Sequence, residues 1–355
     1  MMIPLLLLAA SLSGAQPLDL TAQSGSSAAT PIGAASVSIL KARFIEALDD
    51  ATKGRMLQQI SVTRPVSARD VSALFDLFSR NSDPVVRRKV MDSLALIDPS
   101  SPQLEPMFLT YLRQPEPETQ LFGINGAFHL RSREALPMIR KIAGRKFEAP
   151  DASAITLLSA RNAWWTQYEA LSVLSQWEGE RDRVLPLLRQ KADESPAVGR
   201  LLGQFFWAQT FKDLKGWAES SDDNVREKAV QVAGAKIQPD EARATREGML
   251  DIVRDQKADE EVRHRLALKV GACSTDAQVE ALIAEHDQTK DDKLKLLLVA
   301  AAAYSRSPKA VPLLVRYAKD SSDETMRKGA RAELVDLVGE EQAETLLGER
   351  KDVKK

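Results

Sequence analysis

Residues 259–298 read DEEVRHRLALKVGACSTDAQVEALIAEHDQTKDDKLKLLL, and they contain one eight-residue phrase twice. The phrase is Asp, two variable residues, an apolar residue, Arg or Lys, two variable residues and a second apolar residue. Its two apolar positions are four residues apart, which places both on one face of a helix. The aspartate is typical of the residue that caps a helix N-terminus. The two copies here are Asp259-Val262-Arg263-Leu266 and Asp291-Leu294-Lys295-Leu298.

The same phrase occurs three more times in the chain. Counted by the aspartate, the last four copies are 37, 32 and 32 residues apart. A period in the thirties with helical patterning inside each unit is typical of stacked helical pairs. We therefore predict an all-α fold, a right-handed α-solenoid of about nine antiparallel helix pairs over residues 37–349. The further copies are Asp83-Val86-Arg87-Val90, Asp222-Val225-Arg226-Ala229 and Asp323-Met326-Arg327-Ala330.

A second phrase, proline followed by two bulky apolar residues, supports the same register. It occurs at Pro106, Pro137, Pro186 and Pro312, and proline is tolerated in the first turn of a helix. Its offset from the first phrase indicates degenerate first-phrase positions near Gln120 and Gln167. We expect a loop insertion around residues 144–150, because one unit is longer than the others. The nine expected unit starts are Val37, Asp83, Glu116, Ala163, Ser195, Asp222, Asp259, Asp291 and Asp323.

The two phrases resemble HEAT repeats of the type that also occurs in phycobilisome lyases, from about Asp83 to the C-terminus and most strongly over residues 222–339. The resemblance implies an armadillo-like superhelix. It also implies that each aspartate starts the first helix of a pair and that the basic residue stacks between neighbouring units as a ladder. The implied structural caps are Asp83, Asp222, Asp259, Asp291 and Asp323. The implied structural ladder is Arg87, Arg226, Arg263, Lys295 and Arg327.

The N-terminal sequence indicates export. Residues 3–10 form an apolar run, and Ser13-Gly14-Ala15 offers the small residues of a signal-peptidase site. We interpret 1–15 as a signal peptide cleaved near Ala15, 16–36 as a flexible leader rich in Ser, Ala and Gly, and 350–355 as a polar tail. The expected protein is bacterial and either periplasmic or secreted. The apolar run is too short to cross a bilayer, so no membrane span is expected.

Composition argues against several function classes. The 49 basic and 50 acidic residues balance to a net charge of -1, whereas a protein that binds nucleic acid through phosphates carries a clear basic excess. One cysteine, Cys273, excludes an intrachain disulfide. The three histidines lack zinc-site spacing, and nucleotide-binding glycine motifs and a serine-nucleophile elbow are absent. We therefore expect no catalytic residues, no cofactor and no metal.

All five tryptophans fall between residues 164 and 217. One interpretation is a thick core in the middle of the array. The other is that some of these rings face outward as anchors for a partner, since tryptophan and tyrosine dominate binding hot spots. The candidate partner-binding aromatics are Trp164, Trp165, Trp207 and Trp217. Trp164 and Trp165 lie about 100° apart on a helix, so one can be buried while the other is exposed.

The leading hypothesis is a non-catalytic scaffold that binds a protein or peptide partner in the bacterial cell envelope. The second helices of the pairs would line its concave groove. Two enzymatic alternatives follow from other uses of HEAT-like arrays: a DNA glycosylase that removes alkylated bases, and a lyase that handles a tetrapyrrole. The export signal and the balanced charge weigh against the glycosylase. The sequence leaves the oligomeric state and the identity of the partner open.

Overall fold

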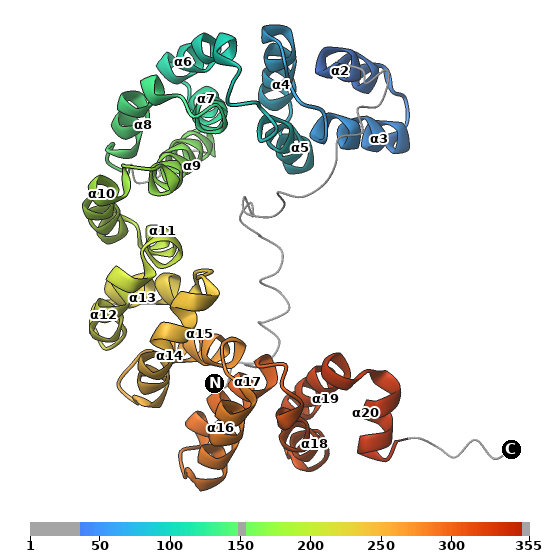
Figure 1. Cartoon of the computed structure of the whole chain (residues 1–355), viewed down its shortest axis with the longest axis vertical. Coiled ribbons are helices and arrows are strands. Elements are labelled where there is room, and N and C mark those ends of the chain that lie inside the picture. The colour runs from blue at the N-terminus through green and yellow to red at the C-terminus, as the bar shows by residue number, and fades with distance from the viewer. Residues whose placement is uncertain (1–35, 148–153, 350–355) are drawn as a thin grey trace, which may run out of the picture. The chain divides into compact units, whose positions relative to one another are not determined.

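The computed structural model describes residues 36–147 and 154–349, and this part of the chain is helical (Figure 1). It contains nineteen α-helices, α2 to α20, a few short 3-10 turns and no β-strand. This confirms the all-α prediction for the described residues. The chain divides into two compact units, with the border after Leu201, inside α11 (Gly199–Phe205). The predicted signal peptide, all of the leader except Ser36, and the tail 350–355 lie outside the described residues.

The N-terminal unit contains the helices from residue 37 to residue 194. Three of them, and not two, precede Asp83, so this region does not follow the single unit expected from Val37. The helices are α2 (Val37–Glu46), α3 (Asp50–Ser61), α4 (Ala68–Arg80), α5 (Pro84–Leu94), α6 (Glu105–Arg113), α7 (Pro117–His129), α8 (Leu136–Ala143), α9 (Ala154–Gln176) and α10 (Arg181–Glu194).

The C-terminal unit has four helices headed by an aspartate, α13, α15, α17 and α19. Their spacing follows the repeat phrase that the sequence shows. The helices are α12 (Trp207–Ala218), α13 (Asp223–Gly234), α14 (Pro239–Arg254), α15 (Glu260–Ala272), α16 (Asp276–Gln288), α17 (Asp292–Tyr304), α18 (Val311–Asp320), α19 (Glu324–Val338) and α20 (Glu340–Leu347).

Successive helices pair as α12 with α13, α14 with α15, α16 with α17 and α18 with α19. Each aspartate-headed helix packs much more against the helix before it than against the helix after it. It is therefore the second helix of a tight hairpin, whereas the resemblance implied the first. The reason is local: Arg226 and Arg327 donate back to Ser220 and Ser321 in the turn that precedes their own helix, and these bonds close that turn.

The aspartate-headed helices also pack against one another. In the C-terminal unit α15 packs extensively against both α13 and α17, whereas α14 and α16 make few contacts with each other. In the N-terminal unit α7 packs closely against α9, and α6 touches α8 only lightly. In the stretches α6–α9 and α13–α17, the odd-numbered helices thus pack more closely against one another than the even-numbered helices do.

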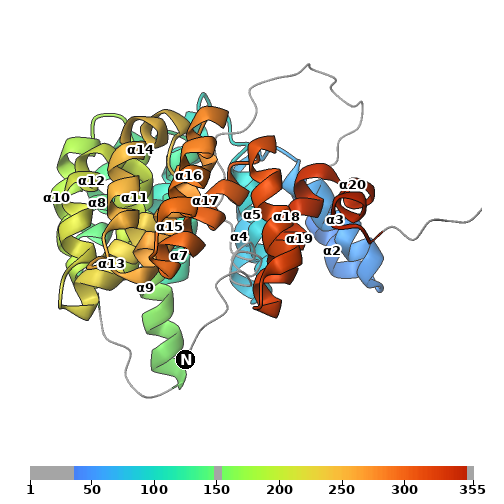
Figure 2. The same cartoon turned by 90° about the horizontal axis from the view of Figure 1, so that it is seen from below.

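Helix α9 accounts for part of the long interval that the sequence indicated. Instead of starting near Ala163, it begins at Ala154 and extends over 23 residues. Figure 2 shows its N-terminal part projecting beyond α7 and α8. Residues 144–147 leave α8 without regular structure, and the rest of the expected loop insertion, 148–150, lies outside the described residues.

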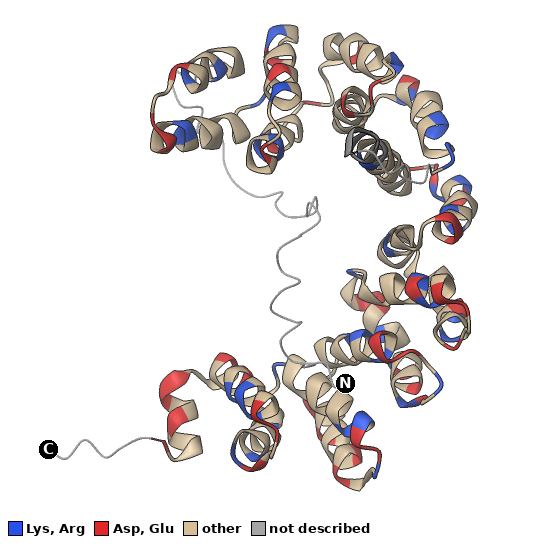
Figure 3. Cartoon of the chain, turned by 180° about the vertical axis from the view of Figure 1, so that it is seen from behind, with Lys and Arg blue, Asp and Glu red and all other residues tan. Residues whose placement is uncertain are grey.

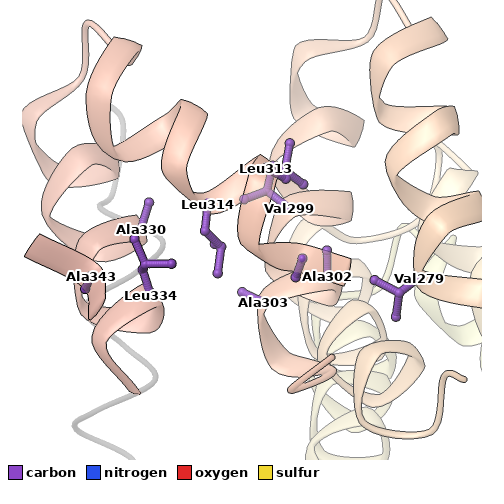
Figure 4. Close-up of a cluster of buried hydrophobic side chains, with 10 residues drawn as sticks. Val279, Val299, Ala302, Ala303, Leu313, Leu314, Ala330, Leu334 and Ala343 are labelled. Carbon is purple, nitrogen blue, oxygen red and sulfur yellow. The ribbon is translucent and has the colours of Figure 1, made fainter. Parts of the chain in front are cut away.

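The cores are built from small and branched aliphatic side chains. At the C-terminal end of the chain, buried residues from five successive helices meet in one cluster (Figure 4). Leu314 and Leu334 are almost completely buried there, and Ala302 and Ala330 allow the helices to approach closely. A helix pair cannot bury its apolar stripe alone, so each pair depends on its neighbours for stability. No helix among the described residues is long and apolar enough to cross a membrane.

Candidate functional site

The five aspartates of the repeat phrase all lie at helix N-caps. The Asp83 carboxylate accepts a hydrogen bond from the Val85 amide at 2.8 Å. Each of the other four accepts from two backbone amides. These bonds satisfy amides that have no acceptor inside their own helix. The helices involved are α5, α13, α15, α17 and α19.

The basic residues of the phrase mostly hold the end of the preceding helix. Arg87, Arg226 and Arg327 each donate to the carbonyl six residues earlier in the chain. Arg263 donates instead to the Val253 carbonyl in the last turn of α14, at 2.9 Å. Lys295 pairs with Asp292 in its own first turn. The arginines therefore serve as C-terminal caps for the previous helix, where carbonyls lack intrahelical donors.

Two glutamines make equivalent bonds at the degenerate positions of the N-terminal unit. The Gln120 amide donates to the Gln114 carbonyl at 2.6 Å, again six residues earlier. The Gln167 amide donates to the carbonyls of Ala143 and Arg145 at the end of α8. Both glutamines are buried. The bond that closes the turn is thus kept where the charge is lost.

The charged side chains are mixed in sign along the helices of each unit, as Figure 3 shows. Many of them pair within a helix or between neighbouring helices, such as Arg254 with Glu285 at 2.8 Å and Arg140 with Glu180. No group of three or more His, Cys, Asp or Glu side chains suited to a metal ion occurs in the part of the chain that the structure describes. The charges therefore serve the surface and the turns.

The predicted partner-binding tryptophans separate into two groups. Trp207 is fully buried, and its indole donates to the Thr245 hydroxyl at 2.9 Å. Trp217 is partly buried, with the Lys228 ammonium 4.4 Å from its ring centroid. Both belong to the packing of the C-terminal unit. Trp207 offers no exposed face to a partner, so it is not part of the candidate site.

Trp164 and Trp165 lie in α9 of the N-terminal unit and form an aromatic group with Tyr168. The Tyr168 ring stacks on Trp164 with centroids 5.2 Å apart and on Trp165 with centroids 5.7 Å apart. Trp165 is the most exposed large aromatic side chain among the described residues, with 51% of its surface accessible. We call Trp164, Trp165 and Tyr168 the α9 aromatic cluster.

The cluster is held in place by contacts from α10 and from the segment after α8. The Trp164 indole donates to the Ser195 hydroxyl at 3.2 Å. The Phe147 ring lies 6.0 Å from Trp164, and the Lys191 ammonium lies 5.6 Å from the Phe147 centroid. Lys191 is buried and pairs with Glu194 at 2.8 Å. These contacts immobilise Trp164 and thereby the exposed Trp165, so the exposed indole starts from an ordered position.

Glu169 follows the cluster on α9 and is partly buried. Burial raises the pKa of its carboxyl to about 7, and the hydrogen bond from the Asn125 side chain on α7 opposes that rise. None of the basic residues that the structure describes contributes to this pKa. A carboxylate without a cationic partner in a partly dry environment is costly, so this group is poised to gain from a cation.

The groups around Glu169 do not supply that cation. Burial lowers the pKa of His129, which lies one turn after Asn125 on α7, to about 4, so its ring is neutral at pH 7. Arg200 on α11 influences Tyr168, whose pKa burial raises to about 12. Its charge is not among the causes of the Glu169 shift. The cluster and Glu169 therefore present aromatic surface next to an uncompensated acid.

The C-terminal unit contains a recess with a volume of about 340 Å³. His286 is buried there, with one ring nitrogen 2.8 Å from the Tyr317 hydroxyl and the other 2.9 Å from Asp287. Arg316 also pairs with Asp287, at 2.6 Å, and Lys295 pairs with Asp292. The charges of Asp287, Arg316 and Lys295 are thus already matched, and Asp320 completes the charged lining of this recess.

No family model and no curated protein matches the chain. The geometry of the α9 aromatic cluster is therefore the basis for the functional argument.

Sequence reasoning singled out Trp164 and Trp165 but not the groups that complete the site. Glu169 lies four residues after Trp165 and hence on the same helix face, which is a pattern visible in the sequence. Asn125 and Arg200 come from other helices, so only tertiary structure brings them near, as the packing of α7 against α9 does for Asn125.

Proposed function

We propose that this protein is a right-handed, HEAT-like α-solenoid that acts as a non-catalytic scaffold for a protein or peptide partner in the bacterial cell envelope. The repeat phrase, the helix pairs within each unit and the capping geometry support the solenoid. The apolar N-terminal run with its small-residue site supports export. The exposed α9 aromatic cluster supports partner binding, and it is the observation on which the proposal depends.

The binding surface would be carried by the odd-numbered helices. In a stacked helical array, the layer whose helices lie closer together forms the inner side of the bend. Close packing of α7 against α9, and of α15 against α17, supports this assignment in each unit separately. The sequence predicts a groove on the helices that follow the aspartate-headed ones, whereas we assign it instead to the layer that contains the aspartate-headed helices.

An exposed, immobilised tryptophan is well suited to anchor a partner. Trp165 offers a large rigid surface whose ordering has already taken place in the free protein. The Tyr168 ring stacks on Trp165, and the centroid of the tilted Trp164 ring lies 6.0 Å from that of Trp165. Trp164 is itself fixed by its hydrogen bond to Ser195. Burial of such a ring contributes on the order of 2 kcal/mol or more to a hot spot.

Site-specific photo-crosslinking in the producing cell tests the proposal. A benzophenone amino acid replaces Trp165 in one variant and the exposed Tyr304 of α17 in a control variant. The expected result is a discrete adduct with one envelope protein at position 165 and none at position 304. Trp164→Phe should weaken the adduct, because it removes the indole bond to Ser195.

Failure has a definite form in this experiment. If position 165 gives no adduct, or the same adducts as position 304, the α9 aromatic cluster is not a binding surface. Mass spectrometry of the purified product checks the localisation separately, since an exported chain should begin close to residue 16. An intact Met1 on the product from the envelope fraction would contradict cleavage near Ala15.

A further inference from the structure

The residues one turn beyond the exposed indole define the chemistry of what binds there. Trp165 and Glu169 are four residues apart on α9, so their side chains project from the same face of that helix. Tyr168 stacks nearly parallel to Trp165, with 14° between the ring planes. An aromatic face and a carboxylate thus lie next to one another on the helix that carries the cluster.

Both parts favour a cation. The face of an indole attracts a positive charge through its quadrupole, most strongly when the cation is desolvated. Glu169 has an amide, Asn125, as its described hydrogen-bond partner, and burial disfavours its ionised form. A cation placed between the indole and this carboxyl would be stabilised by both and would remove the cost of ionising the acid.

On α9 itself, the exposed Arg161 lies four residues before Trp165 and eight before Glu169, and its charge is not among the causes of the Glu169 pKa shift. On the α7 side, Asn125 is uncharged and His129 is neutral at pH 7. On the α11 side, the Arg200 charge acts on the Tyr168 phenol and not on Glu169. Lys191 lies over the Phe147 ring and pairs with Glu194. Phe147 in turn contacts Trp164 and not Trp165, so this cation belongs to the Trp164 end of the cluster.

We propose that Trp165, Tyr168 and Glu169 form a recognition site for an arginine side chain of the partner. The guanidinium stacks on the exposed indole and donates hydrogen bonds to the Glu169 carboxylate. Arginine fits better than lysine because its planar group can stack and donate at the same time. This inference rests on the proposed function, since it names the partner chemistry that the α9 aromatic cluster selects.

The site predicts how binding depends on pH. A guanidinium at Glu169 favours the ionised carboxylate, so binding requires the loss of its proton when the free protein holds one. Since the pKa of the free Glu169 is about 7, affinity should rise between pH 6 and pH 8. The lowered pKa of His129 and the raised pKa of Tyr168 keep both groups neutral over this range.

Selection of binders from a random displayed 12-residue peptide library, with the full mature chain as target, supplies the probe. The best peptides are resynthesised, and each arginine is replaced in turn by citrulline, its neutral isostere. Calorimetry then measures affinity for the wild type, Trp165→Ala, Glu169→Gln and the control Glu178→Gln. Glu178 is an exposed carboxylate just after α9, so its change alters the net charge equally.

The expected result is an arginine whose replacement by citrulline weakens binding to the wild type about 10- to 100-fold. The same replacement should matter less than about 3-fold on Glu169→Gln, and Glu178→Gln should behave like the wild type. Circular dichroism verifies that each variant folds. The rise in affinity from pH 6 to pH 8 should be lost in Glu169→Gln.

Two contrary results have different meanings. Peptides that depend on Trp165 but contain no basic residue, or whose citrulline penalty is the same on Glu169→Gln, would overturn the arginine site and leave the scaffold function standing. Absence of any selected peptide that depends on Trp165 would overturn the proposed function and this inference with it.

Discussion

The two units of the molecule solve the same structural problem with different side chains. In the C-terminal unit, four aspartates each cap a helix with two amide bonds, and three arginines tie back to the preceding turn or helix. In the N-terminal unit only Asp83 and Arg87 follow this pattern. Glu116 makes no side-chain cap bond at the start of α7, and Gln120 and Gln167 replace the basic residue.

The difference shows that the phrase is one means of closing a turn and not a requirement of it. A neutral amide closes the turn as well as a guanidinium does, provided that it is buried and its own groups are satisfied. The irregular unit is also the one that carries the α9 aromatic cluster and the long helix α9. Regular repeats therefore supply the scaffold, and the candidate site lies where the repeat is weakest.

The largest expected effect comes from the closest helix contact in the regular unit. A Cβ at Gly271 on α15 would lie 2.1 Å from the Ala301 carbonyl oxygen on α17, and backbone cannot move aside cheaply. Gly271→Ala should lower the free energy of unfolding by about 2–4 kcal/mol. Denaturant unfolding of the wild type and the variant measures this difference in the free energy of unfolding. At Gly126, in the irregular unit, the nearest atoms to an added Cβ belong to the Phe108 ring, and a side chain can shift more readily than backbone, so Gly126→Ala should cost less.

A matched control separates this contact from helix propensity. Gly216 lies inside α12 with no atom within 4 Å of an added Cβ. Gly216→Ala should therefore stabilise the protein by about 0.5–1 kcal/mol, since alanine favours a helix over glycine. Equal effects at positions 216 and 271 would show that α15 and α17 do not approach as described.

The next effect compares the two ways of closing a turn. Gln120 is almost completely buried, so Gln120→Leu leaves the Gln114 carbonyl without its donor and should cost about 2–3 kcal/mol. Arg226 is more exposed, and Arg226→Met should cost about 1 kcal/mol. Thermal and denaturant unfolding give both values. Arg226→Gln should restore most of the loss, and no restoration would contradict the equivalence of the two residues.

The third effect is a pH dependence that belongs to the irregular unit. The folded-state pKa of Glu169 is raised to about 7, so between pH 4.5 and pH 7 the folded chain holds a proton that the unfolded chain has lost. Its contribution to stability therefore falls as pH rises through this range. Glu169→Gln should stabilise the protein by about 1–2 kcal/mol at pH 8, allowing for partial exposure, and hardly at pH 4.5.

Melting curves of the wild type and Glu169→Gln at several pH values give the difference directly, because other titrating groups cancel. His129 acts in the opposite direction. Its lowered pKa reduces stability as pH falls from about 6.5 to about 4, in both proteins alike. A stability difference between the two proteins that does not change with pH would show that Glu169 titrates normally.

The smallest effect concerns the caps. Asp222→Ala removes two amide bonds and should cost about 1 kcal/mol, whereas Asp83→Ala removes one and should cost less. Glu116→Asp should stabilise α7 by a few tenths of a kcal/mol, because the shorter side chain can reach its own N-terminal amides. Hydrogen exchange at the first turns of α13, α5 and α7 reports these changes. Faster hydrogen exchange in the first turn of α7 in Glu116→Asp would contradict the predicted stabilisation of that helix.

Much of the fold was predictable because its determinants are local. The aspartates cap helices whose starts the phrase predicts, and the proline phrase lies near the starts of α6, α8 and α18. Pro186 is the exception, because it lies inside α10. Cap bonds join residues two or three positions apart, so they follow from spacing alone. The hairpin partner of each aspartate-headed helix did not follow, because both neighbours in the chain are equally near in sequence.

The candidate site was predictable only in part. The clustering of tryptophans pointed to residues 164–217, yet nothing in the pattern distinguished buried Trp207 from exposed Trp165. The exposure of each ring depends on which neighbouring helix covers it. The role of Gln120 and Gln167 was likewise visible only as a gap in the phrase, because a hydrogen bond to a carbonyl has no signature in residue type.

The sequence by itself determined an all-helical chain with its helix starts and its regular C-terminal repeats, because capping and apolar periodicity act within a few residues. Tertiary structure alone decided which helices pack together, which tryptophan stays exposed, and that Glu169 meets Asn125 instead of a cation. Those outcomes depend on the packing of helices that are far apart in sequence, such as α7 against α9, and burial in a particular contact cannot be read from any one segment.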